Sequence, residues 1–223
     1  MAYRRAFSPR QLLKGDDLTR AMVGIGMLFA DQALAEPNIE DTVLSASIEG
    51  MDGDDLRVLG VLVTWLGIHH PWLNADRLVR VVLACDRERV RVFWASVAHW
   101  LRSDRRFARM AHWPLKRRIP LLRTGSEFQV KRRGEDDRFA GSPLLVPAGV
   151  LRDRPGDVLS PKELAQRHRT YRYRVLIGPS YRADMWALLE AEPSLKVAEL
   201  ARRAYGSFAT AWQVKKDFEL LAA

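Results

Sequence analysis

The chain has 223 residues, of which 48% are hydrophobic and 28% are charged, and it contains a single cysteine. This length allows one or two domains with a real core, and the composition excludes a disordered chain. One cysteine excludes an intrachain disulfide and a multi-cysteine zinc site. The formal net charge of +9 indicates an acidic partner, although arginine-rich usage alone would explain part of it.

Residues 1–113 form the first predicted domain, a bundle of helices. Apolar residues at helical spacing predict its first helix: Leu18, Met22, Ile25, Phe29 and Ala33. Further helices are expected from about Leu56 to before Pro71, from Ala75 to Cys85 with Asn74 as its cap, and from about Arg87 to Arg102. We interpret the apolar stripes as a packed core, and this half, which is acidic over residues 1–60, as a dimerisation or partner-binding domain.

The basic start of the chain has no apolar signal segment after it. Its longest apolar stretch, Leu59 to Ile68, is too short to cross a bilayer. We therefore expect a cytoplasmic protein without a membrane segment.

Residues 114–158 form a linker or a small β region, because prolines and glycines interrupt short apolar runs there. Ser126 to Lys131 alternates in polarity, which predicts a strand. Pro143 to Pro147 predicts a short edge strand, since proline at both ends prevents full pairing. We expect the two strands to form a small hairpin.

Residues 159–223 form the third predicted domain. Ser160 and Glu163 predict a capping box that opens a helix ending near His168. Three further helices are expected at 180–189, 196–205 and 208–221, with Gly206 and Ser207 as the last turn. A short helix, a tight turn and a helix with one polar side is the arrangement that enters a DNA major groove.

The spacing within 199–211 matches the pattern E-L-A-x-x-x-G-V-S-x-x-T-V of bacterial helix-turn-helix regulators. The matching residues are Glu199, Leu200, Ala201, Ser207, Thr210 and Ala211. Ala201 is the small residue expected where the second and third helices cross, and Ser207 is the expected N-cap of the third helix. The glycine of the pattern falls on Tyr205, one position before Gly206.

The third helix has one inward and one outward side. The inward stripe is Ala211, Val214, Phe218 and Leu221. Thr210, Gln213 and Lys216 face away and are the base-reading candidates, because Gln pairs with adenine, Thr touches a thymine methyl and Lys reaches guanine. The phosphate-binding candidates are Arg182, Arg202, Arg203, Ser207 and Lys215.

Basic residues accumulate in two other places, and arginine beside a reading helix suits phosphate contacts. One cluster lies within 102–133. The other leads into the predicted helix-turn-helix and consists of Arg167, Arg169, Arg172, Arg174 and Arg182.

From about Val146 to Leu221 the chain resembles bacterial helix-turn-helix proteins encoded beside nucleotidyltransferases. The residues that carry the resemblance are Val146-Pro147, Leu151 to Arg154, Asp157-Val158, Tyr173-Arg174, Leu176 to Gly178, Arg182 to Asp184 and the pattern from Glu199 to Ala211. Such proteins resemble antitoxins of abortive-infection toxin–antitoxin pairs, which act in phage defence. The resemblance implies a DNA-binding regulator that also engages a nucleotidyltransferase-like toxin.

Together these features predict a mainly α protein with an N-terminal helical bundle, a short β region and a C-terminal trihelical, winged-helix-like unit. We expect no wing directly after the third helix, because the chain ends with Glu219 to Ala223. The predicted function is sequence-specific binding of double-stranded DNA in transcription regulation, with antitoxin-like character. We expect a homodimer, since one reading helix contacts only a few base pairs.

Two alternatives remain open. The trihelical unit is also suited to protein docking within a defence or toxin–antitoxin complex, because a fold does not determine a function. An enzyme is not expected. The best enzymatic alternative is a metal-dependent nuclease that uses Glu127, Gln129 and Lys131 on the predicted strand. No metal site and no cofactor are predicted, because no motif with suitable ligand spacing is present.

Overall fold

The computed structural model describes residues 12–112 and 117–222, and the protein is mainly helical. The N-terminal part contains α1 (Gly15–Gly24), α2 (Ile39–Asp52), α3 (Leu56–His69), η1 (His70–Trp72), α4 (Ala75–Leu83), α5 (Glu88–Trp100), η2 (Arg105–Phe107) and α6 (Ala108–Ala111). The remainder contains β1 (Ile119–Pro120), α7 (Ser126–Arg133), β2 (Leu144–Leu145), η3 (Pro155–Asp157), α8 (Pro161–Arg167), α9 (Arg169–Ile177), α10 (Tyr181–Ala191), α11 (Val197–Arg203) and α12 (Phe208–Ala222).

Helix α2 is the centre of the N-terminal bundle, and it packs against α1, α3, α4 and α5. Nearly all of its side chains are buried, which is the pattern of a helix surrounded by others. Asn38 caps α2, Asp55 caps α3 and Asn74 caps α4, each by accepting a backbone N–H bond from the first helical turn. The predicted cap at Asn74 is confirmed, as are the helices that follow Leu56, Ala75 and Arg87.

The first predicted helix ends earlier than the apolar stripe suggested. Helix α1 stops at Gly24, so Phe29 and Ala33 lie outside it. A Cβ at Gly24 would lie 2.4 Å from the carbonyl oxygen of Leu34, and Gly26 has a φ of 89°. Close approach of the returning chain therefore ends the helix, and only glycine permits this approach.

The 126–131 segment is the start of α7 and not a strand, so the prediction was wrong there. Its alternation does not follow burial, because Phe128 is 68% exposed. An acidic residue in the first turn and three basic residues in the last turn complement the helix dipole instead. The expected strand at Pro143–Pro147 is present as β2, but it pairs in parallel with β1, so the predicted hairpin is also wrong.

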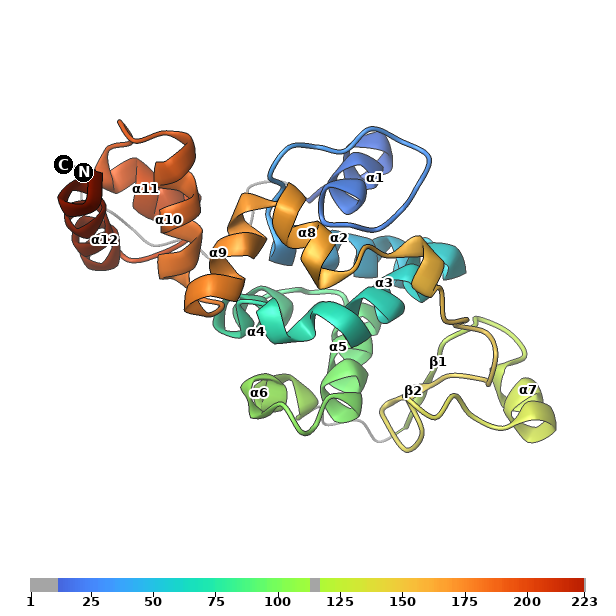
Figure 1. Ribbon diagram of the computed structural model, residues 1–223. Coiled ribbons are helices and arrows are strands. Elements are labelled where there is room, and N and C mark those ends of the chain that lie inside the picture. Colours follow the sequence, from blue (N-terminus) through green and yellow to red (C-terminus); the bar gives the residue numbers. More distant parts are fainter. Residues whose placement is uncertain (1–11, 113–116, 223) are drawn as a thin grey trace.

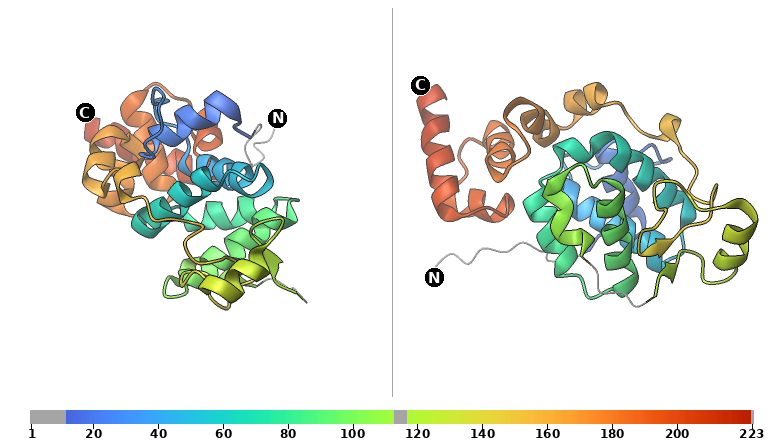
Figure 2. Two further views of the ribbon diagram at one scale, coloured as in Figure 1. Left: turned by 90° about the vertical axis from the view of Figure 1, so that its right-hand side faces the viewer. Right: turned by 90° about the horizontal axis from the view of Figure 1, so that it is seen from below.

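Two separate hydrophobic cores organise the chain. The larger core joins α1–α6 with Leu144, Val158, Leu164 and Tyr171, so it continues through the β region into α9. The second core belongs to α10, α11 and α12 alone. Tyr171 of α9 thus belongs to the larger core and Met185 of α10 to the second core. Figure 1 shows α10–α12 at one end of the molecule and α7 at the opposite end, and Figure 2 shows the same arrangement from below.

Candidate nucleic-acid interface

Helices α10, α11 and α12 form a unit with a core of its own. Its most deeply buried members are Met185, Leu189, Leu200, Ala201, Ala211 and Val214, and α12 packs against both α10 and α11. The predicted inward residues Ala211, Val214 and Phe218 lie in or against this core. Leu221 was also expected there, but it is 80% exposed, because α12 is longer than its two partners and its last turn extends past them.

The turn between α11 and α12 is a Schellman motif. The amide of Gly206 donates to the carbonyl of Ala201 at 2.9 Å, and the amide of Tyr205 donates to that of Arg202 at 3.3 Å. Tyr205 occupies the left-handed position of the motif, with a φ of 54°. Glycine is usual at this position, since a side chain with a Cβ costs roughly 1–2 kcal/mol there.

The side chain of Tyr205 lies against the N-terminal bundle. Its hydroxyl donates to Oδ2 of Asp41 at 2.9 Å, and the guanidinium carbon of Arg77 lies 3.8 Å from its ring centre. Arg77 is completely buried and also binds Asp41 and Asn38. Burial and the charge of Asp41 raise the pKa of Tyr205 to about 12, so the phenol is a neutral donor.

Helix α12 begins at a serine cap and presents a mixed outer face. The hydroxyl of Ser207 accepts from the amide of Thr210 at 3.0 Å, which confirms the predicted N-cap. Gln213 and Lys216 are exposed on this face, next to Phe208 at 45% and Trp212 at 51% exposure. The face therefore combines polar groups with two aromatic rings.

The three base-reading candidates lie along this helix, each with a neighbour. Thr210 is half-buried, and its hydroxyl lies 2.7 Å from that of Ser207. The amide nitrogen of Gln213 donates to Oδ1 of Asp217 at 2.7 Å. The ammonium of Lys216 lies 5.6 Å from the ring centre of Trp212, a cation–π distance.

The five phosphate candidates all have partners within the α10–α12 unit. Arg182 pairs with Asp217 at 2.9 Å, Arg203 pairs with Glu192 at 2.7 Å, and Arg202 pairs with Glu199. Lys215 differs from the arginines, because its ammonium donates to the carbonyl of Leu195 at 2.5 Å and its side chain is only 19% exposed. Ser207 is occupied as the cap of α12.

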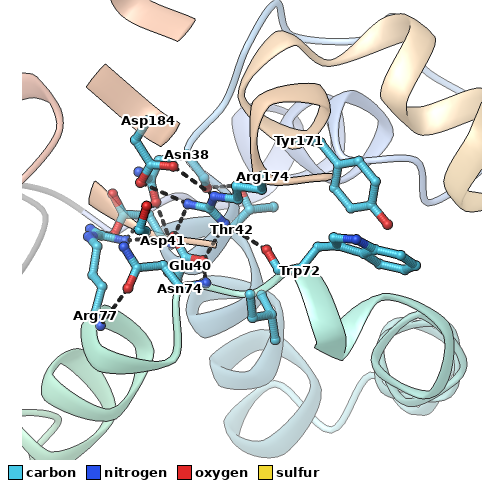
Figure 3. Close-up of polar contacts among 12 residues, drawn as sticks. Asn38, Glu40, Asp41, Thr42, Trp72, Asn74, Arg77, Tyr171, Arg174 and Asp184 are labelled. Carbon is cyan, nitrogen blue, oxygen red and sulfur yellow. Dashed lines mark hydrogen bonds and ion pairs between the residues drawn. The ribbon is translucent and has the colours of Figure 1, made fainter. Parts of the chain in front are cut away.

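A buried ionic network joins α10 to the rest of the protein (Figure 3). Arg174 of α9 donates to both carboxylate oxygens of Asp184, at 2.7 and 3.0 Å, and to both of Glu40, at 2.6 and 2.9 Å. Burial favours the neutral form of Glu40, but Arg174 and Arg77 outweigh it, so the pKa of Glu40 lies below its usual value. The network thus links α2, α9 and α10 through one guanidinium.

No family model, curated protein or solved structure matches this chain. None of the helices within 12–112 and 117–222 combines the length and apolar character needed to cross a membrane. The same ranges contain no group of three or more His, Cys, Asp or Glu side chains placed to hold a metal ion.

The structure shows where members of the two basic clusters lie relative to α12. Arg174 was counted among the arginines leading into the C-terminal segment, but it is buried and neutralised by two carboxylates. Lys131 to Arg133 end α7, at the far end of the molecule from α12 (Figure 1). Arg174 is therefore not available to a ligand on the outer face of α12.

Sequence reasoning missed two residues that shape this interface. Asp217 binds both Gln213 and Arg182, and so it joins a base-reading candidate to a phosphate candidate. Tyr205 was noted only as the residue in place of the pattern's glycine. An aromatic residue at a left-handed turn position is unusual enough to have indicated a contact outside the turn.

Proposed function

We propose that this chain is a helix-turn-helix DNA-binding protein that reads DNA with α12. The observation that carries the proposal is the geometry of the α11–α12 connection. Ala201 is fully buried between packed helices, residue 205 is left-handed where the pattern has glycine, and Ser207 caps the next helix. These are the positions at which the pattern requires a small residue, a left-handed residue and a cap.

The location of α12 also supports the proposal. The helix lies at one end of the molecule, with its outer face turned away from the bundle (Figure 2). Gln213 and Lys216 are exposed there, and their amide and ammonium groups suit adenine and guanine edges. We assign base reading to these two residues and to Thr210 at the start of the helix.

Phosphate contacts would come from arginines that form ion pairs with carboxylates in this structure. Arg182, Arg202 and Arg203 form ion pairs at the surface, and such pairs contribute about 1 kcal/mol or less. A DNA phosphate can therefore replace the carboxylate at little cost. The segment 181–222 holds six basic and six acidic side chains, so base contacts must supply much of the binding.

Within this proposal the protein is a cytoplasmic, homodimeric transcriptional regulator of antitoxin-like type. The dimer would place two α12 helices on two half-sites. The resemblance to proteins encoded beside nucleotidyltransferases supports a nucleotidyltransferase-like toxin as its protein partner.

A second candidate function is protein docking by the same helix. Phe208 and Trp212 are four residues apart on α12, Leu220 follows eight residues later, and the three side chains are 45%, 51% and 70% exposed. Exposed aromatic side chains at helical spacing are typical of helix-in-groove interfaces. This observation supports a partner protein as the alternative ligand of that face.

Binding of the purified chain to its own upstream DNA and to unrelated DNA, over a salt series, separates the two candidates. DNA reading predicts tighter binding to the upstream sequence that survives moderate salt. Gln213→Ala should then lower the preference for the upstream sequence by roughly 1–3 kcal/mol. Equal weak binding to both DNAs, unchanged in Gln213→Ala, would reject DNA reading and favour docking.

A further inference from the structure

Tyr205 occupies a position where glycine would satisfy the turn without strain. The next residue is Gly206, so a glycine is present in this turn but not at its left-handed position. The left-handed φ of Tyr205 must therefore be stabilised by contacts outside the α11–α12 connection. Those contacts are with Asp41 of α2 and Arg77 of α4, both in the N-terminal bundle.

The surface that receives Tyr205 is rigidly held. Arg77 is completely buried, its Nη1 donates to Asn38 at 2.6 Å, and Nη2 binds Asp41. Asn38 in turn caps α2 by accepting the amide of Asp41 at 3.1 Å. The acceptor of the Tyr205 hydroxyl is therefore fixed by the first turn of α2.

The opposite side of the turn is fixed by α10. Gly206 is buried, and a Cβ at this position would lie 2.2 Å from the terminal methyl of Met185. The turn is thus held between α10 on one side and the Arg77–Asp41 pair on the other. Helix α12 begins two residues later, so its direction follows from the geometry of this turn.

We propose that Tyr205 is a positioning residue that couples the N-terminal bundle to α12. This inference rests on the proposed function, because it assigns regulation to the same helix. The first turn of α2 acts on α12 through the Tyr205 side chain, so a change at Asp41 or Arg77 changes the pose of α12. The N-terminal bundle thereby controls the C-terminal unit.

Hydrogen exchange of the full chain tests the coupling directly. The probes are the amides of Tyr205, Gly206 and Ala211, which bond to Arg202, Ala201 and Ser207. Removal of one hydrogen bond by Tyr205→Phe should speed their exchange about fivefold. In the background of Asp41→Asn, the same substitution should add less than about twofold, because the acceptor is already altered.

Tyr181→Phe is the matched control. The hydroxyl of Tyr181 donates to Asp76 of α4 at 2.8 Å, so it also joins the C-terminal unit to the bundle, but from α10 and outside the turn. We expect Tyr181→Phe to change exchange at the three turn amides by less than about twofold. Equal effects of Tyr181→Phe and Tyr205→Phe would overturn the coupling.

Tyr205→Gly separates positioning from a merely structural role. This variant removes the strain and the contact together, so a structural role predicts wild-type preference for upstream over unrelated DNA. Positioning predicts that the preference falls about tenfold while the salt slope stays unchanged, since base contacts are lost and phosphate contacts are kept. Wild-type preference in Tyr205→Gly would overturn the proposal.

Failure of the proposed function is distinguishable from failure of the coupling. If the wild-type chain binds neither DNA, DNA reading is rejected and the exchange measurement alone decides on Tyr205. A fivefold rise confined to Tyr205→Phe would still support the coupling to α12. Unchanged exchange in that variant would overturn it.

Discussion

The hydroxyl of Tyr171 donates a hydrogen bond to Nδ1 of His69, 2.7 Å away, inside the larger core. The other ring nitrogen, Nε2, lies 3.0 Å from the carbonyl of Leu159, which can only accept, so Nε2 carries the proton. Burial lowers the pKa of His69 to about 4 and raises the pKa of Tyr171. Both side chains are therefore neutral in the folded protein at physiological pH.

The His69 environment predicts a loss of stability in mild acid. The ordinary pKa of 6.5 applies in the unfolded chain, so between pH 6.5 and about 4 the unfolded state binds the extra proton. The free energy of unfolding should fall by up to about 3 kcal/mol over this range. Denaturant unfolding at pH 7 and pH 5 measures this dependence. His69→Gln should reduce the pH dependence of the free energy of unfolding. His70→Gln should retain it, because His70 lies outside the buried pair. The same pH dependence in both variants would contradict the prediction.

Arg174→Met should destabilise the protein strongly. It leaves Asp184 buried without its guanidinium and Glu40 with only that of Arg77, 3.7 Å away, and breaking a buried ion pair from one side costs about 3–5 kcal/mol. Arg172→Met on the same helix is the control, since its pair with Glu190 is exposed and worth about 1 kcal/mol or less. Urea unfolding should separate the two variants. Similar midpoints would mean that the Arg174 network does not hold α10 to the bundle.

Local hydrogen bonding explains why some elements were predictable. The capping box of Ser160 and Glu163 is present as expected, and α8 ends at Arg167, just before His168. The cap at Asn74 and the start of α12 after Ser207 were also correct. Each of these features depends on residues three or four positions apart, which a sequence displays directly.

Features that depend on distant residues were not predictable in this way. Arg174 and Glu40 are 134 positions apart, and nothing local distinguishes Arg174 from the exposed arginines around it. The end of α1 at Gly24 depends on the returning chain at Leu34. The alternation at 126–131 was misleading because this segment lies in α7, where only Ser126 is buried. Its polarity pattern therefore does not reflect side-chain packing.

Asp217→Ala should weaken sequence discrimination but not general affinity. Asp217 orients the amide of Gln213 and holds Arg182, so its loss frees both side chains. Removal of a negative charge from the side proposed to face DNA favours phosphate binding, whereas an unfixed Gln213 loses roughly 1 kcal/mol or more of base preference. Titration of upstream and unrelated DNA measures both quantities. Glu219→Gln removes an equal charge from a residue that does not bind Gln213, and it should leave the preference for upstream DNA intact. An equal loss of this preference in both variants would show that Asp217 does not orient Gln213.

Lys216 and Lys215 are adjacent in sequence, but we expect their substitutions to have different effects on the salt slope of DNA binding and on stability. The ammonium of Lys216 lies on the exposed face beside Trp212, where it can reach a phosphate as well as a guanine edge, so Lys216→Met should reduce the salt slope of DNA binding by about 1. Lys215 bonds to the carbonyl of Leu195, which precedes α11, and it is mostly covered. Lys215→Met should therefore leave the salt slope unchanged and lower the stability of the α10–α12 unit by about 1 kcal/mol.

The two lysine variants control for each other, because each removes one charge from the same turn of α12. Binding isotherms at several salt concentrations give the slopes, and hydrogen exchange at the amide of Ala211 reports the stability of the unit. A reduced slope in Lys215→Met would show that its ammonium leaves Leu195 to contact DNA. An unchanged slope in both variants would place the phosphate contacts on α10 and α11 instead, where Arg182, Arg202 and Arg203 are the remaining cations that pair at the surface.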